Sequence, residues 1–193
     1  MGKPKIIFAA PKNKQLRMTD NIILRQETQA DFLAVYEVNH HAFGQENEAK
    51  LVDALRKNKT AFVPELSIVA VKDNRVAGHI LFTKINIKDD KGNVYESLAL
   101  APMSVRPEFQ KTGIGGQLIR KGFDVAKKLG FGSVIVLGHE HYYPKFGFEP
   151  AEKWKIKAPF DVPSNVFMAI ELVPGGLKNI TGTVNYPKEF EIV

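Results

Sequence analysis

The residues of this chain best suited to chemistry form a polar, glycine-rich turn, Gln110-Lys-Thr-Gly-Ile-Gly-Gly116, between an apolar strand and an amphipathic helix. Successive backbone N–H groups in such a turn, at a helix N-terminus, form a site for anions. Gly113, Gly115 and Gly116 let the backbone approach a phosphate because no Cβ stands in the way. The segment therefore predicts a cradle for a pyrophosphate group.

Two familiar phosphate-binding loops do not fit this turn. A P-loop requires Lys and then Ser or Thr after its last glycine, and here Gln117 follows Gly116. The dinucleotide fingerprint G-x-G-x-x-G would place its third glycine at Leu118. It also requires a carboxylate at a strand end about 20 residues later, where this chain has the apolar run 134–137.

The turn instead matches the pattern Q-x-x-G-x-G through Gln110, Gly113 and Gly115, and it resembles motif A of the GNAT N-acetyltransferases. The preceding Val105-Arg-Pro107 and the later Tyr143-Pro-Lys-Phe-Gly-Phe148 are similar to the same family. The resemblance covers roughly residues 22 to 173, and the bacterial YhbS-like branch is the most similar.

This resemblance implies an α/β fold: a single GNAT domain with a mixed central β-sheet flanked by helices, and a bulged strand before the pyrophosphate loop. It implies acetyl-CoA as co-substrate, without a metal, and an amine acceptor that is a small molecule or a protein or peptide. The residues it assigns to acetyl-CoA are Met103, Ser104 and Val105 on the strand, and Gln110, Lys111, Thr112, Gly113, Ile114, Gly115 and Gly116 in the turn.

The strand before the turn carries its own sign of a bulge. Large apolar residues stand at Leu98 and Leu100 and then at Met103 and Val105, so the parity slips by one residue near Pro102. Side chains alternate with period two along a strand, and a slip therefore predicts a bulge or a break. In the family a bulge here frees backbone groups to face the acyl-pantetheine arm. We expect a backbone N–H near Met103 or Ser104 to stabilise the oxyanion.

Acetyl transfer to an amine also needs a proton for the departing thiolate. The chain has no cysteine, so direct attack by the amine in a ternary complex is the simpler route. The family carries a tyrosine four residues before Gly-Phe as the proton donor, and Tyr143 holds that spacing. Phenol and thiol pKa values of roughly 10 and 8.5 permit this transfer. Tyr142 is the second choice, and simple packing of Tyr143 against a strand is the alternative.

The general base is less determined. Glu96 lies at the start of the bulged strand, on the substrate side in the family's arrangement, and we take it as the catalytic partner of Tyr143. A water chain could serve instead. The other candidates are His79, which a core role would also explain, and four residues near the first two helices: His40, His41, Glu46 and Glu48.

The loop after the apolar run 134–137 departs from the family. The usual Asn-x-x-Ala would fall on Val136 and His139, and neither matches, so the pantetheine contacts there stay open. His139, Glu140 and His141 could suggest a metal site. No third ligand stands at a suitable spacing, and we expect no metal.

Composition narrows the class further. The 193 residues suit one domain. The absence of cysteine excludes disulfides and fits a cytoplasmic protein. No apolar run approaches the roughly 18 residues of a membrane span. Five of the six net positive charges fall in the first 17 residues. We therefore expect residues 1–20 to be a basic extension, 21–173 the acetyltransferase domain, and 174–193 a tail that packs on it.

Periodicity predicts the elements that must hold the site. Thr28 and Asp31 have capping-box spacing before one helix, and a second helix is expected over 46–57. A third runs from Gly115 to Gly130. Strands are expected over 22–25, 66–71, 76–85 and 134–137, with further antiparallel strands through 166–172.

Two other functions are compatible with part of these sequence features. A non-catalytic acyl-CoA-binding or sensing module would need the same pyrophosphate cradle but no proton donor. The presence of Tyr143 therefore argues against this alternative. A nucleic-acid-binding protein rests on the basic extension alone and is not favoured. A homodimer is compatible with the sequence, which contains no motif for one particular acceptor.

Overall fold

The computed structural model describes residues 22–193, and the expected basic extension lies outside them. The longer elements are α1 (Phe32–Phe43), α2 (Asn47–Leu55), β2 (Phe62–Lys72), β3 (Arg75–Lys88), β4 (Val94–Val105), α3 (Ile114–Lys128), β5 (Ser133–Leu137) and β8 (Phe167–Glu171). The short strands are β1 (Ile23–Gln26), β6 (Glu149–Pro150), β7 (Ile156–Lys157) and β9 (Gly182–Asn185). Five 3₁₀ turns complete the order: η1 (Gln29–Asp31), η2 (Pro107–Phe109), η3 (Tyr143–Phe146), η4 (Ala151–Trp154) and η5 (Lys188–Ile192).

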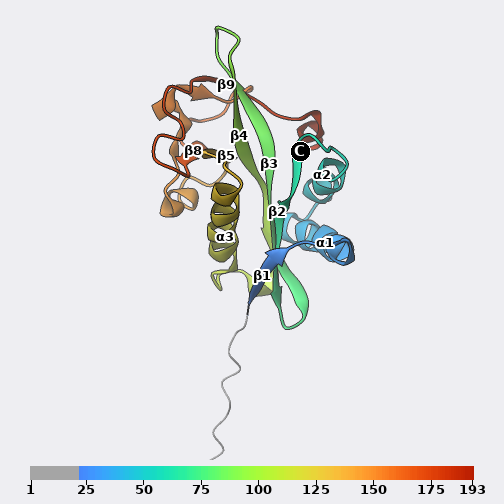
Figure 1. The fold of residues 1–193 in the computed structure, drawn as a ribbon. Helices are drawn as coiled ribbons and strands as arrows, with labels where there is room; N and C mark the ends of the chain where they lie inside the picture. Colours follow the sequence, from blue (N-terminus) through green and yellow to red (C-terminus); the bar gives the residue numbers. More distant parts are fainter. Residues whose placement is uncertain (1–21) are drawn as a thin grey trace, which may run out of the picture.

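The strands form one mixed sheet with helices on both faces, which confirms the expected α/β architecture (Figure 1). The order is β1-β2-β3-β4-β5-β8-β6, and β9 pairs with both β3 and β7. Neighbours are antiparallel except for the parallel pairs β4–β5 and β7–β9. Side chains of β3 alternate between the two faces: Ile80 and Phe82 pack in the core under α3, and Leu81 in the core under α1 and α2.

Local sequence signals predicted most of the helix and strand boundaries correctly. The capping box forms, since the backbone N–H of Thr28 donates to a carboxylate oxygen of Asp31 at 2.7 Å. β2 begins earlier than expected, at Phe62, because the register shifts between Phe62 and Ser67 and so accommodates Pro64, which cannot donate a ladder hydrogen bond.

The expected bulge is present in β4. Ile80 pairs with Met103, whereas Phe82 pairs with Leu100, so β4 holds one residue more than β3 over this stretch. From the bulged stretch onward, β4 also has no pairing with β5. Its parallel pairing with β5 is limited to Leu98–Val134 and Ala99–Ile135. The two central strands therefore separate after Ala99.

Residues 174–193 are part of the sheet and not only a tail packed on it. β9 within them pairs with β3 over Asn86 to Lys88. η5 then packs on the α2 side, where the side-chain amide of Asn58 donates to Glu189 at 3.0 Å. The chain thus crosses from the β7–β8 half of the molecule to the α1–α2 half (Figure 1).

His79 on β3 is a fully buried core residue. Its Nε2 lies 2.9 Å from the Ser67 hydroxyl, and its Nδ1 lies 3.4 Å from the Asn39 amide nitrogen. Burial, with a smaller contribution from the Arg56 charge, lowers the pKa of the imidazole to about 3. His79 is therefore neutral at physiological pH, and its ring joins α1 to the sheet.

This buried histidine predicts an acid-sensitive stability. Between about pH 6.5 and pH 3 the unfolded chain binds one proton at this residue that the folded protein does not. The free energy of unfolding should therefore fall as the pH falls through this window. Urea denaturation at about pH 6.5 and about pH 4.5 should show the wild type losing roughly 1 kcal/mol per pH unit more than His79→Gln. Equal pH dependence of the two proteins would contradict the assignment.

Candidate active site

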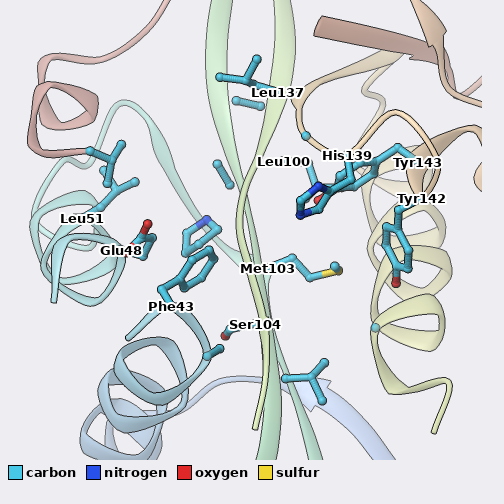
Figure 2. A pocket seen from close by; sticks show the side chains of 18 of the residues that line it. Phe43, Glu48, Leu51, Leu100, Met103, Ser104, Leu137, His139, Tyr142 and Tyr143 are labelled. Atoms are coloured by element: carbon cyan, nitrogen blue, oxygen red, sulfur yellow. The ribbon is translucent and has the colours of Figure 1, made fainter. Parts of the chain in front are cut away.

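A cleft of about 880 Å³ lies where β4 and β5 separate. α1 and α2 flank it on one side of the sheet, and α3 with the loop after β5 on the other (Figure 2). The lining residues are Ala42, Phe43, Glu48, Leu51, residues 99–105, Phe109, Gln110, Lys111, residues 113–116, Ile135, residues 137–139, Tyr142, Tyr143, Phe160, Tyr186, Phe190 and Val193.

One edge of β4 faces this cleft with its backbone. The N–H of Arg106 donates to Ala77 of β3 at 2.9 Å. N–H directions alternate along a strand, so the N–H groups of Met103 and Val105 point to the opposite edge, where β5 has diverged. The side chains alternate as well: Met103 points toward α3 and Ser104 toward α1 (Figure 2). The Ser104 hydroxyl is buried without a hydrogen-bond partner among the described residues.

Side-chain hydrogen bonds to nearby backbone carbonyl groups fix the conformation of the glycine-rich turn. The Gln110 side-chain amide donates to the Val105 carbonyl at 3.1 Å, and the Thr112 hydroxyl to the Phe109 carbonyl at 2.6 Å. Lys111 and Gly113 have φ of 61° and 88°, in the left-handed region. Within residues 22–193, no backbone carbonyl accepts from the N–H groups of residues 111–116. These groups therefore remain available to an anion at the N-terminus of α3.

The expected cofactor residues thus divide into two kinds. Gln110 and Thr112 use their side chains to shape the turn, and Thr112 does not line the cleft. The glycines leave room: a Cβ on Gly115 would lie 2.7 Å from the Tyr142 hydroxyl oxygen. Beyond them Arg120, in the second turn of α3, donates to the Gly116 carbonyl at 3.3 Å and lies over the Phe146 ring, but it does not line the cleft.

The two adjacent tyrosines point in different directions. Their rings are nearly perpendicular, at 88°, with centroids 5.3 Å apart. Tyr142 is half-buried and lies along α3 above Gly115, whereas Tyr143 is buried and packs edge-on against Phe148 (Figure 2). Burial raises the pKa of Tyr143, with a smaller contribution from Tyr142. The Tyr143 hydroxyl has no hydrogen-bond partner in the described chain, although the residue lines the cleft.

The structure does not bring Glu96 to the cleft. Its carboxylate is more than half exposed and pairs with Lys84 at 3.4 Å. Glu96 shares its strand parity with Leu98, so it lies on the α3 face near the start of β4, short of the separation from β5. Among the other candidate bases, Glu48 alone lines the cleft.

The loop after β5 contributes His139 to the cleft wall. Its neighbours Glu140 and His141 approach each other to 3.3 Å at the surface. In the part of the chain that the structure describes, no three His, Cys, Asp or Glu residues are grouped as a metal ion requires. Nor is any helix there long and apolar enough to cross a membrane.

The C-terminal part of the cleft wall was not predicted as a site. Tyr186 stacks on Phe160 with centroids 6.4 Å apart and contacts Phe190 at 5.0 Å. The sequence indicates only that Tyr186 and Phe190 are apolar enough to pack. Their place in the cleft follows from the crossing of the chain over the sheet, which no local pattern encodes.

A mixed sheet split between two central strands, with an anion-binding helix terminus at the split, is the architecture of an acyl-CoA-dependent acyltransferase. Comparison with known proteins agrees. Residues 31–148 match the model of the acetyltransferase (GNAT) family, and the chain belongs to that family, which confirms the resemblance seen in the sequence. The N-acetyltransferase YjhQ of Escherichia coli (strain K12) is 40% identical over 135 residues, which are 69% of this chain and 74% of YjhQ.

Two solved structures extend the similarity over most of the chain. A crystal structure of the N-acetyltransferase YhbS from Escherichia coli in complex with CoA has a TM-score of 0.80 and 27% identity, and covers 88% of this chain and 92% of YhbS. That of a GNAT acetyltransferase from Brucella melitensis in complex with acetyl-CoA has a TM-score of 0.71 and 30% identity, and covers 89% of this chain and 99% of the other.

Proposed function

We propose that the protein transfers the acetyl group of acetyl-CoA to a primary amine, by direct attack of the amine in a ternary complex. The observation that carries this proposal is the row of unpaired N–H groups at residues 111–116, beside the free edge of β4. The two solved relatives bound to CoA or acetyl-CoA support it.

The co-substrate would be held mainly by backbone. The N–H groups of Gly113, Ile114, Gly115 and Gly116 would bind its pyrophosphate at the positive end of α3, with Lys111 as the nearby cation. The pantetheine arm is amide-rich and would pair with the free edge of β4 at Met103 and Val105, in the manner of an added strand.

The reaction then requires that the site stabilise the oxyanion, supply a proton to the departing thiolate and let the acceptor amine lose a proton. The amine nitrogen attacks the thioester carbon, and the N–H of Met103, on the cleft edge of β4, would stabilise the oxyanion. The C–S bond breaks, and the thiolate takes the phenolic proton of Tyr143. Before it attacks, the acceptor ammonium must lose a proton, which would leave through water because Glu96 lies outside the cleft. Tyr143 would then regain a proton from the same water, which restores the phenol for the next turnover.

The raised pKa of Tyr143 suits a proton donor. The phenol stays protonated at neutral pH, and burial that disfavours the phenolate also disfavours the thiolate beside it. Proton transfer between the two therefore stays closer to balance than the raised phenol pKa alone would suggest. A hydroxyl that has no protein partner is also free to reorient toward a sulfur.

The cradle is tested by Gly113→Glu, which adds a side chain and a negative charge where the pyrophosphate would bind. Gly92→Glu is a matched control: Gly92 has φ of 86° against 88° for Gly113, both have open space around them, and Gly92 is far from the cleft. Acetyl-CoA should raise the melting temperature of wild type and Gly92→Glu alike. Calorimetry should show at least about 100-fold weaker binding to Gly113→Glu. Equal affinity of a folded Gly113→Glu protein would refute the cradle.

The proton donor is tested by Tyr143→Phe, which keeps the packing ring and removes the proton. Turnover, followed as CoA release with an accepted amine, should fall by about 10² to 10⁴, while acetyl-CoA affinity stays within a few-fold. Tyr142→Phe, at the neighbouring ring, should reduce turnover far less. Full turnover in Tyr143→Phe, with chemistry rate-limiting, would remove the assigned role. Acetyl-CoA binding without turnover on any amine would favour a non-catalytic acyl-CoA module.

A further inference from the structure

The cleft continues beyond the cofactor side into a second half, which we call the acceptor pocket. It lies on the α1–α2 face of the sheet, away from Tyr142 and the glycine-rich turn (Figure 2). Its residues come from two segments far apart in sequence. They are Phe43, Glu48 and Leu51 from α1 and α2, and Tyr186, Phe190 and Val193 from the C-terminal segment.

The acceptor pocket and its rim expose large apolar side chains to solvent. Phe43 is 42% exposed, Val193 56%, and Phe160, which stacks on Tyr186 at the rim, 49%. Apolar surface gathered in a concavity is the usual mark of a ligand site, because covering it removes water at about 25 cal/mol per Å².

The C-terminal segment that forms one wall of the acceptor pocket is fixed to the rest of the protein. The Asn58 amide holds Glu189 at 3.0 Å, and β9 anchors the segment on β3 just before Tyr186. Phe190 also packs against the cores on both sides of the crossing. The aromatic faces of Tyr186 and Phe190 therefore present a fixed surface to a bound molecule.

Glu48 supplies the only acidic side chain among the described residues that line the cleft. Both of its oxygens accept from the Gln45 side-chain amide, at 3.0 and 3.1 Å, which orients the group without neutralising it. Its neighbour Glu46 is different, since it pairs with Lys50 at 2.7 Å and does not line the cleft. Glu48 thus places one uncompensated negative charge beside an apolar wall.

We infer that the acceptor is a monoamine on an aromatic or similarly bulky apolar body, with its ammonium against Glu48 and its body against the wall of Phe43, Tyr186 and Phe190. This inference rests on the proposed function and names the class of its substrate. A polyamine would bury further ammonium groups against apolar side chains, with no second acidic side chain in the described cleft lining to pair with them.

The inference is tested by CoA release from acetyl-CoA with phenethylamine, spermidine and Nα-acetyl-lysine. We expect kcat/KM for phenethylamine to exceed that for the other two by at least about tenfold. Glu48→Gln should raise the KM for phenethylamine by about 10- to 100-fold, the loss of one charged contact, and leave the KM for acetyl-CoA unchanged. Glu46→Gln is the matched control and should behave as wild type.

The apolar wall is tested separately by Phe43→Ala, at a half-exposed position where truncation costs little stability. It should lower kcat/KM for phenethylamine by about tenfold and spare ethylamine, which does not reach the wall. Leu33→Ala, on the exposed face of the same helix, should change neither. Preference for spermidine or Nα-acetyl-lysine, or an unchanged Glu48→Gln enzyme, would overturn the inference and leave the acetyltransferase function standing.

Calorimetric titration of phenethylamine into the CoA-saturated protein tests the acceptor pocket independently of catalysis. Binding that Glu48→Gln weakens, in a protein that acetylates no amine, would support the acceptor pocket and refute the catalytic function.

Discussion

The separation of β4 from β5 after Ala99 is the constraint on which the site depends. The parallel pairing stops at Ala99–Ile135, directly before the stretch in which β4 gains a residue against β3. A buried backbone group without a partner costs about 1–3 kcal/mol, so two strands that merely parted inside a core would be unstable. Here the parted edge opens on a cleft, where solvent or a ligand can satisfy it. The cleft therefore both makes the break in the sheet energetically tolerable and exposes the unpaired edge of β4 to a ligand.

The separation also positions the groups that follow each strand. β4 leads into the glycine-rich turn, and β5 leads into the loop that carries His139 and the two tyrosines. Both strands are still paired at Leu98 and Val134, so their loops emerge on opposite sides of one cleft. Tyr142 closes the gap between them, since its hydroxyl lies over Gly115 at the start of α3. A residue at Gly115 with a Cβ would force that ring away, which ties the glycine of one loop to the tyrosine of the other.

Short-range patterns predicted the local structure around the proposed cofactor side of the cleft, but not the residues that line its other side. The parity slip around Pro102, the left-handed turn at Gly113 and the capping box at Thr28 are written in neighbouring residues. Glu96 could not be positioned in this way, because the distance from it to the bulge depends on where β4 and β5 part. Glu48, Tyr186 and Phe190 converge only through the crossing of the C-terminal segment over the sheet. His79 is a core residue, as its place alone on an apolar strand predicts, because Ser67 and Asn39 supply polar partners for both ring nitrogens.

Under the proposed function, the two halves of the cleft would recognise their ligands by different means, with a consequence for specificity. The cofactor side offers mostly backbone groups, whose positions depend on φ, on the bulge and on small residues, so few substitutions leave it intact. The acceptor side offers side chains from α1, α2 and the C-terminal segment, which make no hydrogen bond to the glycine-rich turn. Changes at Phe43, Glu48 or Phe190 would therefore alter which amine is accepted without disturbing the proposed pyrophosphate cradle. A single fold can in this way keep one acyl donor and exchange its acceptors.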